Sequence, residues 1–353
     1  MHVAKAIWAS ASAVLLSSFA TTAFARSNCT NSTLEFFMTS DGLHYAYEYH
    51  PAQGLNQTFL FFHGFPSFHR DWDHQVAALI AQGYGTLAPD LLGYGRSDKP
   101  TDISIYNGKR LAGHLNELLD HIGLEHVIGV GHDYGSAVLS RMVVYYQEKF
   151  EGLIFLSVGY RAPGGFFDID AINANGVHLN GIMSFGYWYF LWRYDAPMVL
   201  RNHLDSFWHL VWPVNTTVWP VHLNPLGAAR AWLTADTRTD DPEYMDLGYK
   251  EEWKAWMSLP NATESALQFH RGHLIGLDVA DDELLTDEDW MLDMPVLTIG
   301  GLNDSASRHE FMRETEQWTR AGYRHENLEG GHWLALESTP EVNALLLDFV
   351  RSR

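Results

Sequence analysis

The chain has 353 residues, 46% hydrophobic and 14% aromatic, which is ample for a large core and excludes global disorder. Its 43 acidic and 23 basic residues give a formal net charge of −20, and no basic run stands out. This balance argues against nucleic acid or an anionic membrane surface as a partner. It also favours a neutral substrate, because an anionic one would approach against the field of the protein.

The first 25 residues have the pattern of an export signal. Lys5 precedes an apolar stretch from Ala6 to Phe19, and Ala23-Phe24-Ala25 places small residues where a signal peptidase cleaves. We therefore expect cleavage after Ala25 and a secreted chain. The apolar stretch is short for a membrane anchor, and no later segment has about 18 uninterrupted apolar residues, so we expect no membrane span.

Two further features bear on the exported chain. The one cysteine, Cys29, leaves no intrachain disulfide to form. N-glycosylation sequons predict a glycoprotein if the host is a eukaryote. They begin at Asn28, Asn31, Asn56, Asn215, Asn261 and Asn303.

Strand and helix patterns alternate through the first 160 residues. Strands are expected at 43–49, 58–62, 85–89, 126–130 and 152–158, where β-type runs end in turn residues. Helical spacing is found at 71–82, at 111–122 and from Ala137 onwards. Such alternation predicts right-handed crossovers and a mainly parallel sheet.

The composition changes after about Arg161. From there to about Glu283 the chain is rich in Trp, Tyr, His and Pro, with helical stretches and few strand runs. Strand character returns at 294–299 and 323–328, and a final helix is expected at 340–349. We therefore predict an α/β core formed by residues 26–160 and 284–353, with a helical cap inserted at 161–283.

The segment Gly131-His132-Asp133-Tyr134-Gly135 lies between a predicted strand and a predicted helix. This is the context of a nucleophile elbow, a tight turn that needs small residues on both sides. The usual serine is replaced by Asp133, which is ionised at neutral pH and needs no base to attack. A turn-forming or helix-capping aspartate would give the same local pattern.

Three more motifs accompany the elbow in the chain order nucleophile, acid, histidine. His63-Gly64-Phe65-Pro66 follows a strand at the position of an oxyanion loop, so the amides of Phe65 and Tyr134 are candidate donors to a developing charge. Asp304 follows the strand at 294–299, and Gly331-His332-Trp333 follows the last strand.

Together with residues 90–100, these motifs resemble the α/β-hydrolase superfamily and, within it, the epoxide hydrolase family. The resemblance covers about the whole mature chain and is specific only as a combination. It implies that Asp133 attacks an epoxide carbon to form an ester. It also implies that His332, oriented by Asp304, activates the water that hydrolyses this ester, while the amides of Phe65 and Tyr134 stabilise the oxyanion.

The resemblance further implies two hydrogen-bond donors in the cap for the leaving alkoxide. Tyr187 matches the first, with Tyr189 as the neighbour that is easily mistaken for it. His270 stands where the family has its second tyrosine, and a protonated histidine would give a rate that falls as pH rises through its pKa. The alternative is that His270 only packs and Tyr187 acts alone.

The aromatic residues of the cap suggest a hydrophobic, neutral epoxide of moderate size. We expect Trp188, Tyr189 and Phe269 to bind substrate. The wider set of candidate lining residues also includes Phe166, Phe167, Phe185, Phe207 and Trp212, although each would equally suit a core. No histidine has metal-type spacing, and no phosphate-loop or dinucleotide motif is found, so neither a metal nor a cofactor is implied.

Other functions remain open from the sequence. A haloalkane or haloacid dehalogenase resembles this chain in its aspartate elbow, although Phe65 and Tyr134 match neither type. An ester hydrolase is disfavoured because an aspartate nucleophile would form an anhydride. A non-catalytic ligand-binding protein of the same fold has no evident need for Asp133, Asp304 and His332 together.

Overall fold

The computed structural model describes residues 34–164 and 166–352. The predicted signal peptide with its cleavage site after Ala25, Cys29 and the sequons at Asn28 and Asn31 lie outside these residues. Among the residues described, no helix is long and apolar enough to cross a membrane.

A single sheet runs through the described α/β core, in the order β1-β2-β4-β3-β5-β6-β7-β8. Only the β1–β2 and β2–β4 pairs are antiparallel, and all later neighbours are parallel. The strands are β1 (Glu35–Met38), β2 (His44–His50), β3 (Thr58–Phe62), β4 (Gly85–Pro89), β5 (Val127–His132), β6 (Phe150–Leu156), β7 (Val296–Gly301) and β8 (Tyr323–Leu328). The mainly parallel sheet expected from the strand–helix alternation is confirmed.

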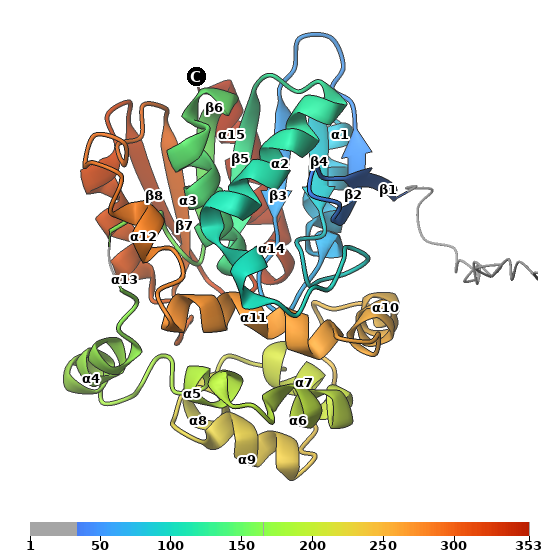
Figure 1. Cartoon of the computed structure of the whole chain (residues 1–353), viewed down its shortest axis with the longest axis vertical. Helices are drawn as coiled ribbons and strands as arrows, with labels where there is room; N and C mark the ends of the chain where they lie inside the picture. The colour runs from blue at the N-terminus through green and yellow to red at the C-terminus, as the bar shows by residue number, and fades with distance from the viewer. Residues whose placement is uncertain (1–33, 165, 353) are drawn as a thin grey trace, which may run out of the picture. The chain divides into compact units, whose positions relative to one another are not determined.

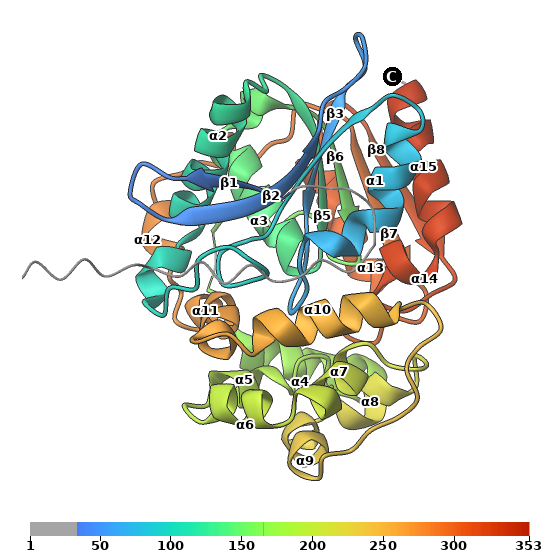
Figure 2. The ribbon, with the colours of Figure 1, turned by 90° about the vertical axis from the view of Figure 1, so that its right-hand side faces the viewer.

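Helices cover both faces of this sheet. On one face lie α2 (Gly108–Ile122) and α3 (Tyr134–Tyr145), and on the other lie α1 (Asp73–Ile80), α14 (Leu334–Glu337) and α15 (Thr339–Arg351) (Figure 2). The remaining core elements are α13 (His309–Met312) and the 3-10 turns η1 (His69–Trp72), η2 (Ile103–Tyr106), η3 (Gln147–Lys149) and η4 (Arg313–Trp318). Strands β3 and β5 are buried along their whole length because both faces are covered.

Between β6 and β7 the described chain is helical and contains no strand. Its helices α10 and α11 lie between the sheet and the group α5 to α9, as both views show (Figures 1 and 2). The helices are α4 (Ile169–Asn180), α5 (Trp188–Trp192), α6 (Ala196–Asn202), α7 (Leu204–Val211), α8 (Val218–His222), α9 (Ala228–Thr234), α10 (Leu247–Met257), α11 (Ala262–Leu274) and α12 (Val279–Asp282).

The end of the helical insertion is held to the core by an ion pair. Asp282, at the end of α12, accepts two hydrogen bonds from the guanidinium of Arg141 on α3, one of them 2.9 Å long. The side chains are 3% and 16% exposed, so the pair is shielded from water. The second carboxylate near Arg141, that of Asp278, is 3.7 Å away.

Replacing Asp282 with alanine should therefore destabilise the protein by about 3 kcal/mol, because the shielded charge of Arg141 loses its bidentate partner. The free energy of unfolding in urea measures the effect. Glu283→Ala removes an exposed carboxylate from the neighbouring position and should change the stability by less than about 0.5 kcal/mol. Equal stability of the two variants would show that this ion pair does not hold the insertion.

Candidate active site

Asp133 occupies the tight turn between β5 and α3. Its backbone has φ 51°, a conformation that non-glycine residues rarely adopt. A Cβ atom on Gly131 would lie 2.7 Å from the Cα of Ser136, and one on Gly135 would lie 2.1 Å from the carbonyl oxygen of Phe62. The turn therefore admits only glycine at both positions. The Asp133 side chain makes no capping hydrogen bond to α3, which argues against the helix-cap interpretation.

The carboxylate of Asp133 is held from two sides. Its Oδ1 accepts a hydrogen bond of 2.9 Å from the backbone N–H of Phe65, in the loop that follows β3. Its Oδ2 lies 3.4 Å from Nε2 of His332. A Cβ on Gly64 would lie 2.6 Å from the Cβ of Asp133, so a residue without a side chain is required for the loop to come this close.

His332 is held between two carboxylates. Its Nδ1 lies 2.7 Å from Oδ2 of Asp304, whose Oδ1 accepts hydrogen bonds from the backbone N–H groups of Ala306 and Ser307 at 2.9 Å. The backbone carbonyl of His332 is within 2.8 Å of Nε2 of His132 and accepts a 2.7 Å bond from Ser157. These contacts orient the imidazole so that Nε2 faces Asp133.

Neighbouring charges determine the protonation states of His332 and Asp133. Burial by itself lowers the pKa of His332, but the carboxylates of Asp304 and Asp133 outweigh it and raise the pKa to about 10. Burial by itself raises the pKa of Asp133, but His332 and the Phe65 N–H hold it well below its usual range. At neutral pH the pair is therefore an imidazolium beside an ionised nucleophile.

A small apolar cavity of about 40 Å³ lies between the elbow and the cap. Asp133 and His332 reach it from the core, and Tyr187 and His270 reach it from the cap. Its other lining residues are Phe65, Pro66, Phe190, Leu191, Phe207, Leu210, Val211, Trp219, Leu223, Ala229, Leu233 and Trp333. The structure thus brings the expected nucleophile, base and both cap donors to one cavity.

His270 is packed between the rings of Phe65, 4.5 Å away, and Trp188, 4.6 Å away. Its Nδ1 is buried without a hydrogen-bond partner among the described residues. Burial lowers the pKa of His270 to about 4. The ring is therefore neutral at pH 7. If a protonated His270 were the acid, the rate would fall as pH rises through about 4.

The other expected site residues lie further from the nucleophile. Tyr189 is turned away from the cavity, and its hydroxyl donates to Asp170. Trp188 and Phe269 form a second layer, since Trp188 packs on His270 and Phe269 packs on Tyr134 with ring centroids 3.4 Å apart. Among the wider set, Phe207 lines the cavity, Phe166 is exposed and Trp212 is in the core. No bond of the Tyr134 amide to Asp133 is seen.

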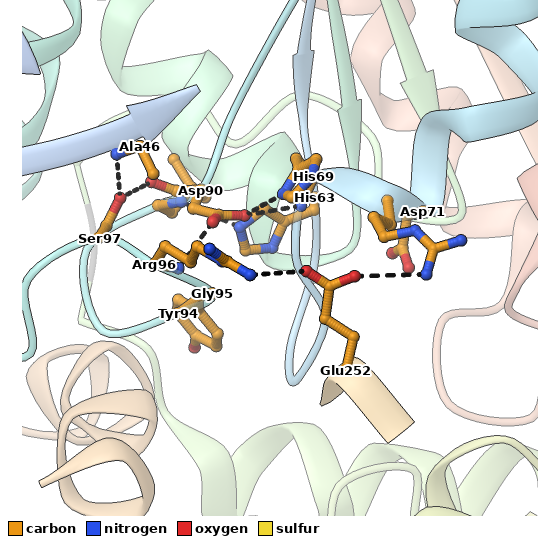
Figure 3. A network of polar contacts seen from close by, with 12 residues as sticks. Ala46, His63, His69, Asp71, Asp90, Tyr94, Gly95, Arg96, Ser97 and Glu252 are labelled. Carbon is orange, nitrogen blue, oxygen red and sulfur yellow. Dashed lines mark hydrogen bonds and ion pairs between the residues drawn. The ribbon is translucent and has the colours of Figure 1, made fainter. Parts of the chain in front are cut away.

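A buried ion pair that sequence reasoning missed supports the loop after β3 (Figure 3). Asp90 accepts two bonds from His69, from its backbone N–H at 2.9 Å and from its ring Nδ1 at 2.7 Å. Burial opposes this charge, but Asp90 raises the pKa of His69 to about 9. His63 completes the link by accepting a 2.9 Å bond from the Leu91 N–H. Positions 69 and 90 are 21 residues apart and lie in no shared motif, so no signal in the sequence pointed to this pair.

The same loop is also attached to the cap. The indole N–H of Trp253 donates to the Pro66 carbonyl at 2.8 Å, and the Tyr249 hydroxyl donates to Asp71 at 2.5 Å. Arg70 lies 3.4 Å from Glu252 of α10, and Arg96 lies 3.8 Å from the same carboxylate (the Arg96 pair is drawn in Figure 3). The Phe65 amide is therefore positioned by the core and the cap together. Within the described residues, no cluster of three or more His, Cys, Asp or Glu side chains is arranged to hold a metal.

Asp304→Asn should lower the pKa of His332 from about 10, because one of the two carboxylates that stabilise the imidazolium is lost. An NMR titration of the imidazole nitrogens measures this pKa. Asp293→Asn removes an exposed carboxylate elsewhere on the core and should leave the pKa unchanged. An unaltered titration in Asp304→Asn would mean that Asp304 does not control the charge of His332.

Comparison with known proteins places the chain in a fold class. The sequence model of the alpha/beta hydrolase fold family matches residues 57–195. Epoxide hydrolase A of Mycobacterium tuberculosis is 28% identical over 316 residues, which cover 82% of this chain and 88% of that protein. Epoxide hydrolase 2 of Siraitia grosvenorii is 36% identical over 107 residues, but the match spans only 34% of its length.

Solved structures show the same architecture. Epoxide hydrolase A from Mycobacterium thermoresistibile superposes with a TM-score of 0.73 at 24% identity, covering 91% of this chain and 98% of the other. An epoxide hydrolase from an endophytic Streptomyces also gives a TM-score of 0.73, at 23% identity. The chain is therefore an α/β-hydrolase-fold protein with epoxide hydrolases among its relatives.

Proposed function

We propose that this protein is an epoxide hydrolase that opens a hydrophobic epoxide to a vicinal diol through an ester on Asp133. The observation that carries the proposal is the apolar cavity in which the carboxylate of Asp133 faces two cap donors, Tyr187 and His270. The names of the relatives add support. Apart from the paired charges of Asp133 and His332, the cavity lining carries no charged side chain, which suits a neutral, apolar substrate.

In the first step the carboxylate of Asp133 attacks an epoxide carbon. A carbon–oxygen bond to Asp133 forms as the epoxide carbon–oxygen bond breaks, and the oxygen leaves as an alkoxide. Tyr187 donates a proton to this oxygen and His270 donates a hydrogen bond from its neutral ring. The buried Nδ1 of His270 has no hydrogen-bond partner among the described residues, so an N–H at Nδ1 would have no acceptor there. This favours the tautomer with the N–H on Nε2.

In the second step water attacks the ester carbon of Asp133. Formation of the ester removes one of the two negative charges beside His332, so its pKa falls and the ring releases its proton to solvent. His332 then takes a proton from the water and passes it to the departing alkoxide. The N–H of Phe65, already directed at Oδ1, stabilises the oxyanion. The second proton of the water, now on the Asp133 carboxyl, returns to Tyr187. This leaves the diol and the free carboxylate, beside which His332 takes up a proton from solvent again.

Dehalogenation is the second candidate function because it uses the same nucleophile and base. A departing halide needs further N–H donors that face the cavity, besides the one assigned to His270. The two tryptophans that line it, Trp219 and Trp333, donate their indole N–H groups to the backbone carbonyls of Leu210 and Val211 at 2.8 Å. The lining therefore suits an alkoxide, which Tyr187 and His270 can bind, better than a halide.

His332→Gln should trap the ester, because the nucleophile remains and the base is lost. Hydrolysis should slow by about a thousandfold. Intact mass after incubation with aryl, terpenoid and fatty-acid epoxides should show a gain equal to a whole epoxide, mapped to the peptide that contains Asp133. Asp133→Ala should show none. Alkylation with halide loss from haloalkanes, without any epoxide adduct, would support the dehalogenase; no adduct from either panel in folded protein would indicate a ligand-binding protein.

The rate of ester formation should change little between about pH 5 and pH 9, because His270 is neutral above its pKa of about 4 and Asp133 stays ionised. Burial also keeps the pKa of Tyr187 well above its usual value, so its proton is retained. Rapid-quench mass spectrometry of the wild-type protein gives this rate. His270→Phe should be slower by about a hundredfold at each pH. A tenfold fall per pH unit above about pH 6 would instead identify a protonated His270 as the acid.

A further inference from the structure

A second hollow, much larger than the cavity, adjoins the catalytic histidine. It has a volume of about 310 Å³ and meets the apolar cavity at Trp219, His332 and Trp333, which line both. Its remaining lining residues are Pro213, Val214, Asn215, Thr216, Tyr244, Asn303, Asp304, Ser305, Glu329, Gly330, Gly331 and Glu337. We call it the polar hollow.

The chemistry of the polar hollow differs from that of the cavity. Hydroxyl, amide and carboxylate groups line much of it, beside Pro213, Val214 and two tryptophans, so it is more polar than the cavity. Asp133 and His270 are absent from it, and the aliphatic residues of α7 and α9 line only the cavity. Its ionisable lining residues include three acids and no lysine or arginine among the described residues. Such a surface attracts water and repels a carboxylate or another anion.

The two spaces meet at His332 and the two tryptophans beside it. The ring of Trp219 lies against that of His332, with centroids 5.0 Å apart, and its indole N–H is anchored to the carbonyl of Leu210. The carboxylate of Glu337, which also lines the hollow, accepts hydrogen bonds from the backbone N–H groups of Gly331 and Trp333 at 2.5 and 3.0 Å. The histidine itself is thus the polar group that reaches both spaces.

Hydrolysis of the ester needs a water molecule beside Asp133, and the polar hollow offers a source for it. Once the alkyl group is bound to Asp133, it occupies an apolar cavity of only about 40 Å³. Apolar cavities hold water poorly, and a water needs at least two polar partners to be retained. The polar hollow has room and partners for several waters, and it borders the base that must activate one of them.

We propose that the polar hollow is the site that stores and supplies the hydrolytic water, separate from the space that takes the substrate. This inference rests on the proposed function, since it concerns the second step of that reaction. Water moves from the hollow past Trp219 to Nε2 of His332. The acids around the hollow also favour the imidazolium that forms when His332 takes the proton of this water.

Thr216 is the residue at which the polar hollow can be filled. It lines the hollow, and its Cγ2 lies 3.1 Å from a Cβ placed on Gly331, so its side chain points towards the residue before His332. Thr216→Trp should slow ester hydrolysis by about tenfold and leave ester formation unchanged. The two rates are separated by rapid-quench mass spectrometry with an epoxide that forms the adduct on His332→Gln, and the variant should accumulate the adduct in the steady state.

Val221→Trp is the matched control, because Val221 is 58% exposed on α8 and does not line the hollow. It should leave both rates unchanged. Thr216→Phe tests the same space with a smaller ring, and normal ester formation in either variant reports a folded site. Unchanged hydrolysis in both Thr216 variants would overturn the proposal, and slower ester formation would make the hollow a substrate passage instead. Failure of the proposed function is distinct, because no adduct would then form even on His332→Gln.

Discussion

Two buried carboxylates, Asp133 and Asp304, share one imidazolium, and the rest of the site depends on this arrangement. Neither charge would be tolerated away from water without it, because an unpaired buried ion costs several kcal/mol. In the proposed reaction, the same pairing keeps the nucleophile Asp133 ionised and the base His332 protonated until the ester forms. When Asp133 loses its charge, His332 loses part of what holds its proton. The electrostatics of the resting state therefore prepare the second step of the proposed reaction.

The backbone around Asp133 is built to allow these charges to approach. Strand β5 ends in a strained turn, and the absence of side chains at Gly64, Gly131 and Gly135 lets the loop after β3 and the first turn of α3 close around it. The Asp90–His69 pair fixes the same loop from the core, while Trp253 and Tyr249 fix it from the cap. A change in the cap can thus reach the Phe65 amide without touching the nucleophile.

His332 lies between two spaces of different polarity, the apolar cavity and the polar hollow. Aliphatic and aromatic residues of α5, α7 and α9 close over the nucleophile, while the loops before α8 and after β7 and β8 leave a polar hollow at the opposite edge of the imidazole. An organic substrate and water have opposite solvation needs. Two separate environments that meet at His332, the general base of the proposed reaction, would satisfy both, with Trp219 between them.

Local sequence determined the elements that its patterns specify strongly. Strands β3 and β4 and helix α2 lie where apolar runs, turn residues and the stop at Gly123 predicted them, because burial on both faces or on one helical face imposes those patterns. The resemblance of the short motifs singled out Asp133, Asp304, His332, Tyr187 and His270, all of which border the cavity or the polar hollow. Only the tertiary structure shows that Tyr187 lines the cavity while Tyr189 does not, and that Trp188 and Phe269 lie in a second layer. It also pairs His69 with Asp90 and, by burial, makes the ring of His270 neutral. Those outcomes depend on side-chain direction and on the burial of charge by segments distant in the chain, and neither quantity is carried by local spacing.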